Sequence, residues 1–115
     1  MNAAQRKGPD YEIQVAKFLS EWFGVDVDRT PSHGNKDQGD IKFRDWAIEC
    51  KNQRAMKLSE WMNQTEIERQ NAHKRWGVLL IKRKMKGVAQ SYAVMPLAQL
   101  AEVMSLLEEP DRKAM

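Results

Sequence analysis

The sequence predicts a single α/β (α+β) domain in which helices flank a mixed central β-sheet. Residues 9–24 and 96–109 carry apolar residues at helical spacing. Strand-like runs lie between them, and "VLLIKRK" at residues 78–84 opens with apolar residues on both faces, as a central strand does. The length of 115 residues suits one domain, residues 1–115, with a modest core. We expect residues 1–8 to be a flexible basic terminus and residues 111–115 a loose tail.

The elements are expected in the order α-β-β-β-α-β-β-α. In the first helix, Pro9 suits the first turn and Gly24 suits the end. The runs "DIKF" and "WAIECK" flank a tight turn and predict a hairpin. Ser59 suits the N-cap of a long polar helix that Gly77 would stop. The expected strands are residues 25–29, 40–43, 46–51, 78–84 and 88–95.

The composition indicates the cellular compartment more clearly than it indicates a binding partner. The net charge of +3, from 19 basic and 16 acidic residues, is weak support for a nucleic-acid partner. The single Cys50 has no intrachain disulfide partner, which favours a reducing interior. The apolar run "VLLI" is far too short for a membrane span, and "MNAAQRKGPD" lacks the apolar region of a signal peptide. We expect a soluble, cytoplasmic protein with no membrane partner.

Alternation along "WAIECK" assigns its side chains to two faces. Trp46, Ile48 and Cys50 share one face, which suits a core. Glu49 and Lys51 share the other face. Two interpretations of that second face stay open with roughly even weight: a half-wet strand that faces solvent, or a site that uses both groups.

Two further carboxylates favour a site. Asp40 follows Gly39 and, in the predicted hairpin, faces Glu49 across the strands, where like charges repel unless a cation lies between them. Glu12 heads the apolar stripe of the first helix, where a lone carboxylate is costly. Three converging carboxylates predict a hard divalent cation such as Mg²⁺. Lys51 beside it would orient a metal-activated water that attacks phosphate.

This pattern resembles a known nuclease superfamily. Gly39 and Asp40 followed by "ECK" match the D…(D/E)xK signature of PD-(D/E)xK nucleases, which have a restriction-endonuclease-like core, although Gly39 replaces the usual Pro. The stretch "RKGPDYEIQVAKFL" and the loop "TPSHG" resemble those of archaeal-type Holliday junction resolvases and their phage-borne relatives. The resemblance covers roughly residues 6–84, and a phage-encoded, DNA-associated protein is one expectation from it.

The resemblance implies an active site of metal ligands, a lysine beside the nucleophile and a serine near the scissile phosphate. Asp40 and Glu49 would bind Mg²⁺ directly, with Mn²⁺ as a substitute, and Glu12 would complete the site directly or through water. No small-molecule cofactor is implied, and paired nicks across a four-way junction imply a homodimer. The implied site comprises Glu12, Ser32, Asp40, Glu49, Cys50 through its carbonyl, and Lys51.

Basic residues at two places are candidate DNA contacts. By the resemblance, two residues before the first helix would grip the DNA backbone. The turn "KRKMK" suits phosphate contact or, equally, a solubilising role. His33 beside Ser32 either assists at the phosphate or has no chemical task, and the second interpretation is favoured about two to one. The candidate DNA-binding residues are Arg6, Lys7, Ser32, His33, Lys82, Arg83 and Lys84.

The polar helix "SEWMNQTEIERQNAHKRW" carries a few apolar residues and two glutamines whose roles need to be assigned. We interpret Trp61 and Met62 as core or dimer contacts in preference to base-stacking residues. Gln64 and Gln70 are placed where either could approach the site, and the spacing does not decide between them.

The leading hypothesis is therefore a metal-dependent, structure-specific DNA endonuclease of the Holliday junction resolvase type. It would hydrolyse phosphodiesters and make paired symmetric nicks in branched DNA. One alternative keeps the chemistry and changes the substrate, as a restriction-like or repair nuclease on duplex or flap DNA. The other is a DNA-binding module that keeps the fold without cutting.

Overall fold

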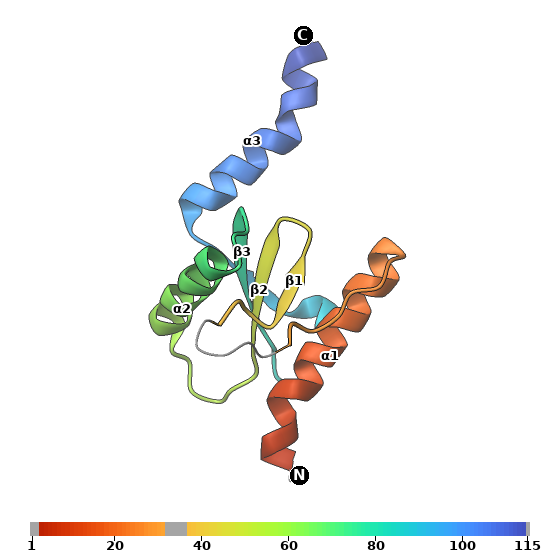
Figure 1. Cartoon of the computed structure of the whole chain (residues 1–115), viewed down its shortest axis with the longest axis vertical. Coiled ribbons are helices and arrows are strands. Elements are labelled where there is room, and N and C mark those ends of the chain that lie inside the picture. Colours follow the sequence, from red (N-terminus) through yellow and green to blue (C-terminus); the bar gives the residue numbers. More distant parts are fainter. Residues whose placement is uncertain (1–2, 32–36, 115) are drawn as a thin grey trace.

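A four-stranded mixed sheet forms the centre of the molecule (Figure 1). The computed structural model describes residues 3–31 and 37–114, with side chains described for residues 7–31 and 37–108. The helices are α1 Ala3–Phe23, α2 Leu58–Asn71 and α3 Leu97–Ala114. The strands are β1 Ile41–Phe43, β2 Trp46–Lys51, β3 Trp76–Ile81 and β4 Tyr92–Val94, and a short 3-10 turn, η1 Val88–Gln90, precedes β4.

The sheet has the order β1-β2-β3-β4. The central strands β2 and β3 are parallel, and β1 and β4 pair antiparallel at the two edges. Helix α2 makes the crossover that a parallel pair requires. Helices α1 and α2 lie on either side of the sheet in Figure 1. The predicted α/β (α+β) class, with a restriction-endonuclease-like mixed sheet flanked by helices, is confirmed.

The two faces of the sheet have separate apolar clusters. On the α1 face, Ile48 and Cys50 of β2 pack with Tyr11 and Val15 of α1. On the α2 face, Trp61 of α2 packs against Leu79 and Ile81 of β3. Both faces of β2 and β3 are therefore covered, and the face that carries Glu49 does not face solvent.

Several local expectations differ from the structure. Residues 3–8 belong to α1, so Pro9 lies inside that helix rather than in its first turn, and α3 continues through residues 111–114, which were expected to be a loose tail. Within the expected strand at residues 88–95, residues 88–90 form η1 and β4 covers residues 92–94. Residues 25–29 form one bridge, between Arg29 and Ile41, because the Val27 N–H donates to Ser20 Oγ of α1 at 2.9 Å. The N-cap of α2 is Lys57 rather than Ser59. Helix α2 ends before His73, whose φ of 55° is left-handed, and residues 76–77 begin β3 instead of ending the helix.

Helix α3 projects from the rest of the molecule (Figure 1). The Gln99 amide joins it to β3 by donating to Gly77 O at 2.7 Å and accepting from Gly77 N–H at 3.1 Å. Leu97 and Leu107 remain 78% and 74% exposed, so the apolar stripe of this helix is left uncovered. Within the described residues, no helix combines the length and apolar character needed to cross a membrane.

Gly39 positions the start of β1 and yields a testable prediction. Its φ is +91°, and a Cβ built there would lie 3.2 Å from the Ile48 carbonyl oxygen. Gly39→Ala should therefore lower the free energy of unfolding by about 1–3 kcal/mol, measured by urea denaturation. Gly8→Ala is the matched control, because a Cβ there meets nothing within 4 Å. Equal loss in both variants would contradict this account of Gly39.

Candidate active site

The hairpin of β1 and β2 brings Asp40 beside Glu49. The register pairs Ile41 with Ile48, so Asp40 lies opposite Glu49 just before β1. The Asp40 N–H donates to Ile48 O at 2.9 Å, and Asp40 Oδ2 accepts from the Cys50 N–H at 2.7 Å. Glu49 is 3% exposed, on the face of β2 that α2 covers. Two of the predicted acidic residues therefore meet at the C-terminal half of β2.

Helix α2 adds a carboxylate that the sequence prediction did not include. Glu68 is 1% exposed and follows Trp61 and Thr65 along the buried stripe of the helix. Its Oε1 accepts from Gln64 Nε2 at 2.8 Å, whereas its Oε2 is buried without a hydrogen-bond partner. Gln64 thus lies at the site, but Gln70 points to Glu66 on the outside of the helix.

Asp37 completes a compact group of acids. Carboxylate oxygens of Asp37, Glu49 and Glu68 all lie within 4.8 Å of one another. The Gly39 N–H donates to Asp37 Oδ1 at 2.9 Å, and Asn71 of α2 donates to the Asp37 carbonyl at 2.9 Å. This segment is thereby tied to both β1 and α2.

Glu12 approaches the pair from α1. Its Oε1 accepts from Arg29 Nε at 3.1 Å, which partly neutralises the charge. The Asp40 carboxyl lies near enough to raise the pKa of Glu12, although burial is the larger cause. The acidic residues predicted from three separated segments are therefore gathered in one place.

Crowding away from water raises the pKa values of these acids. Burial and then the neighbouring Glu49 carboxyl raise the pKa of Asp40 from 3.8 to about 8. Burial likewise raises the pKa of Glu49 to about 8 and that of Glu68 to about 7. Acids that keep protons near neutral pH mark a site where a cation can replace those protons.

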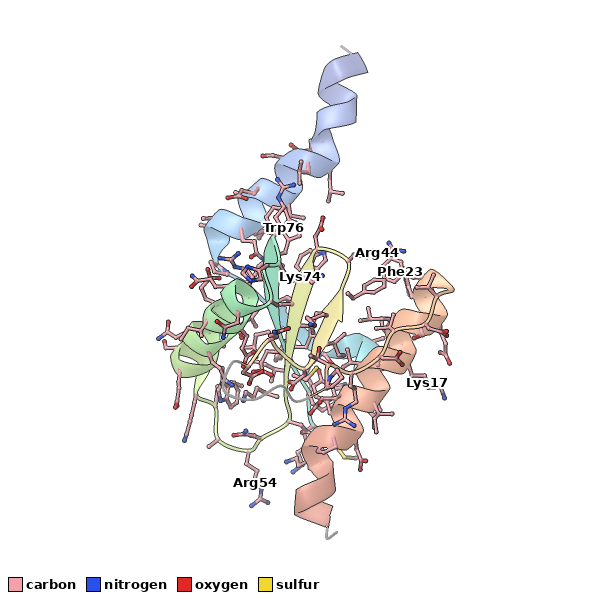
Figure 2. All side chains as sticks on the ribbon, viewed as in Figure 1. Lys17, Phe23, Arg44, Arg54, Lys74 and Trp76 are labelled. Carbon is pink, nitrogen blue, oxygen red and sulfur yellow. The ribbon has the colours of Figure 1, made fainter. Side chains whose placement is uncertain are left out.

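A pocket of about 600 Å³ opens over four of the acids, Glu12, Asp37, Asp40 and Glu49. Its basic lining residues are Lys7 of α1, Lys51 at the end of β2, and Arg54 in the following loop. Figure 2 shows Arg54 pointing outward from that loop, away from the sheet. The Lys51 ammonium lies 6.0 Å from the centre of the Trp61 ring. Acids at the base and basic groups at the rim form a site suited to a cation and a phosphate together.

Apart from Lys7, no predicted DNA contact whose side chain the structure describes lines this pocket. Ser32 and His33 lie outside the described residues, as does the side chain of Arg6, whose backbone is in α1. The Lys82 backbone N–H donates to Lys51 O, so the basic turn lies at the same C-terminal end of the central strands as Lys51. The Lys82 ammonium donates to Lys86 O at 2.6 Å, and the Arg83 guanidinium lies 4.8 Å from the Tyr92 ring centre.

Lys82 therefore braces its own turn, and Arg83 packs against the segment that includes β4. Lys84 is exposed and free of that task in the described contacts. Fewer basic side chains of this turn are therefore available to contact DNA than its sequence suggests.

Three residues of the site were missed by sequence reasoning. Glu68 had a usable signal, because it stands seven residues after Trp61 and three after Thr65, on one helical stripe. Arg54 also had one, since loops at the C-terminal end of parallel strands gather at one edge. Asp37 lies in a turn-rich loop where no periodicity applies.

The fold and this site together define a PD-(D/E)xK nuclease core. Asp40 immediately precedes the first strand of the hairpin, and Glu49 and Lys51 share one face of the second strand. A family model described as "Phage putative PDDEXK endonuclease" matches residues 3–112, and the chain belongs to this family. The predicted resemblance to the superfamily and its phage-borne relatives is confirmed. The protein is thus a nuclease of this superfamily, with DNA as the implied substrate.

Comparison with curated proteins and with solved structures gave no significant match. Nucleases of the superfamily generally use a divalent metal, and the acidic group around Glu49 agrees with that general property.

Burial of Glu68 predicts how stability responds to pH. The folded-state pKa of about 7 exceeds the ordinary 4.5, so Glu68 progressively destabilises the metal-free fold as pH rises between these values. Glu68→Gln should therefore gain stability relative to wild type as pH rises from about 4.5 to about 7, and the gain should then level off, measured by urea denaturation with EDTA present.

Glu66→Gln is the control on the same helix. The Arg69 partner lowers the pKa of Glu66 below its usual range. Glu66 is therefore fully ionised above that range, and its contribution to the free energy of unfolding no longer changes with pH there. The stability difference between Glu66→Gln and wild type should stay flat over the same interval. A flat difference for Glu68→Gln as well would contradict the placement of Glu68.

Proposed function

We propose that the protein is a divalent-metal-dependent, structure-specific DNA endonuclease of the Holliday junction resolvase type. The observation that carries this is the pocket where Asp40, Glu49 and Lys51 meet beneath a basic rim. Membership of the family supplies the nuclease class. The preference for branched DNA rests on the resemblance of residues 6–19 and of the Ser32 loop to junction resolvases.

The residues present fit a hard cation such as Mg²⁺, with Mn²⁺ as a substitute. The group offers oxygen donors, and its buried acids lack enough nearby positive charge to hold them ionised. Asp40, Glu49 and the Cys50 carbonyl would hold the ion, and Glu12 would complete the shell directly or through water. When bound, the ion would lower the pKa of a water molecule and screen the phosphodiester charge.

The chain's own residues would then orient and stabilise the reacting groups. Lys51 would position the attacking water and stabilise charge that develops on the phosphate. Lys7 and Arg54 at the rim would hold DNA phosphates, and Ser32 would lie near the scissile one. Arg29 keeps the Glu12 carboxylate in place.

A cleavage panel tests this proposal. Labelled four-way junction, flap and linear duplex are incubated with the protein in Mg²⁺ or in EDTA. We expect paired symmetric nicks in the junction that require Mg²⁺. Preferential cutting of duplex or flap would instead support a restriction-like or repair nuclease. Binding of junction without cutting would support a non-cleaving module and overturn the proposal.

Variants in the same assay test the assigned roles. Asp40→Asn and Glu49→Gln should reduce cleavage by about a thousandfold or more and leave junction binding intact. Lys51→Ala should slow cleavage while Mn²⁺ affinity, measured by calorimetry, changes little. Glu21→Gln, an exposed acid on α1, is the control and should cut at the wild-type rate. Normal cutting by Asp40→Asn would remove Asp40 from the site.

Paired nicks need two sites, which a second copy of this chain would supply. Four exposed apolar residues of α3 have the three-four-three spacing of a coiled-coil seam. A helix of this length without tertiary packing is marginally stable in water, which favours its pairing with the same helix of another copy. The seam consists of Leu97, Leu100, Met104 and Leu107.

Sedimentation of the full chain tests this interface. Wild type should be a dimer, and Met104→Glu should be a monomer because the charge would lie within the apolar seam. Ala98→Glu, exposed on another side of the helix, should remain a dimer. A dimer that persists in Met104→Glu would move the interface away from α3.

A further inference from the structure

Two loops at the same end of the sheet carry the same short sequence pattern. The loop after β2 contains "RAMK" at residues 54–57, and the turn after β3 contains "RKMK" at residues 83–86. Strands β2 and β3 are parallel and end together, since Lys51 pairs with Ile81. Figure 1 shows both loops at the end of the sheet that lies away from α3. The pattern of arginine, methionine and lysine is therefore presented twice at the end of the sheet where the pocket opens.

Both methionines project into solvent. Met56 is 57% exposed and Met85 is 90% exposed. A single exposed apolar residue is common and needs no explanation. Two methionines in the same basic setting, at the same end of the sheet, indicate a contact surface.

Met85 occupies a position that its backbone does not favour. The Lys86 N–H donates to Arg83 O at 3.2 Å and closes a turn in which Met85 has a φ of 63°. Glycine or asparagine is preferred at such a left-handed position. Neither packing nor backbone conformation accounts for a methionine here, and unfavourable conformations of this kind cluster at functional sites.

The turn also holds Met85 in place. The Lys82 ammonium donates to Arg83 O at 2.9 Å and to Lys86 O at 2.6 Å, and these carbonyls flank the methionine in sequence. Lys84 and Lys86 are exposed on either side of it. Met85 is thus presented on a braced turn between two cations.

The loop after β2 has its basic side chains available. Among the contacts of the described residues, the side chains of residues 52–57 make no hydrogen bond or ion pair. Arg54 lines the pocket, and Met56 follows it by two residues. A phosphate held by Arg54 or Lys57 would therefore bring the adjoining nucleotide close to Met56.

We propose that Met56 and Met85 are apolar wedges that enter branched DNA at the branch point and unstack the bases beside the scissile phosphate. The inference rests on the proposed function and deepens it, because it names the feature of the protein that selects branched DNA. Proteins that deform DNA insert apolar side chains between base steps while basic residues hold the phosphates.

A branch point is where such wedges enter most easily. Unstacking costs least where bases are already poorly stacked or unpaired, so the wedges favour a branch over continuous duplex. Methionine suits this contact because its flexible thioether side chain adapts to surfaces of varied shape. The contact reads no base edge, so the resulting selectivity is for DNA structure rather than sequence.

The fluorescence of 2-aminopurine tests the inference. This adenine analogue is placed beside the branch of a four-way junction, and its emission rises when it unstacks. Every protein compared is the full chain with Asp40→Asn, so that junction is bound in Mg²⁺ without being cut. Asp40→Asn alone should raise the emission. Adding Met56→Ala and Met85→Gly should remove most of that rise at saturating protein and weaken binding to junction, relative to linear duplex, by about tenfold.

Two controls separate the wedges from general effects. Ile67→Ala removes an apolar side chain of α2 that is 58% exposed, and it should leave both the emission and the affinity unchanged. Met85→Gly should not lower the free energy of unfolding, measured in urea, because a φ of 63° suits glycine. A lost signal in that variant is then not a loss of folding.

The outcomes separate this inference from the proposed function. An equal rise in emission with and without the two methionines would overturn the wedges and leave the nuclease proposal standing. Junction binding that causes no rise would do the same. Arg54→Ala with Lys57→Ala should weaken binding yet keep the rise at saturation, and its loss there would assign unstacking to the basic residues and overturn the wedges. No junction binding together with no Mg²⁺-dependent cleavage by the wild type would overturn both proposals.

Discussion

The constraint on which this structure depends is the burial of Glu49 beside other acids between the sheet and α2. Asp40, Glu49 and Glu68 all have pKa values raised by burial, so the fold holds them at an electrostatic cost. A fold selected for stability alone would place apolar residues there. The cost is consistent with a site that is completed by a cation.

The two faces of strand β2 have different roles, one in core packing and the other in the pocket. Ile48 and Cys50 pack into the α1 cluster and anchor the strand, while Glu49 and Lys51 on the opposite face serve the pocket. The hairpin register then determines where Asp40 lies, and Gly39 permits the close approach to Ile48 that the register needs. Stability and chemistry therefore share one strand without competing for the same side chains.

The predictable part of the site is the part governed by local periodicity. Period-two alternation and a tight turn were sufficient to pair Asp40 with Glu49 and to place Lys51 beside them. Glu68 was missed because α2 is polar on most sides, so its buried face is not evident until the helix is docked on β3. The expected strand at residues 25–29 failed for a similar reason, since Ser20 of α1 takes the Val27 N–H. Tertiary contacts decided both cases.

The arrangement of charge also links metal binding to DNA binding. Without a cation, each acid beneath the pocket that loses its proton repels a phosphate that the basic groups at the rim attract. A bound cation removes that repulsion, so each ligand should strengthen the binding of the other, as linkage requires. The net charge of +3 therefore understates the attraction for DNA once the acids are neutralised. If the proposed function holds, a phosphodiester would therefore settle in the pocket most readily after the metal has bound.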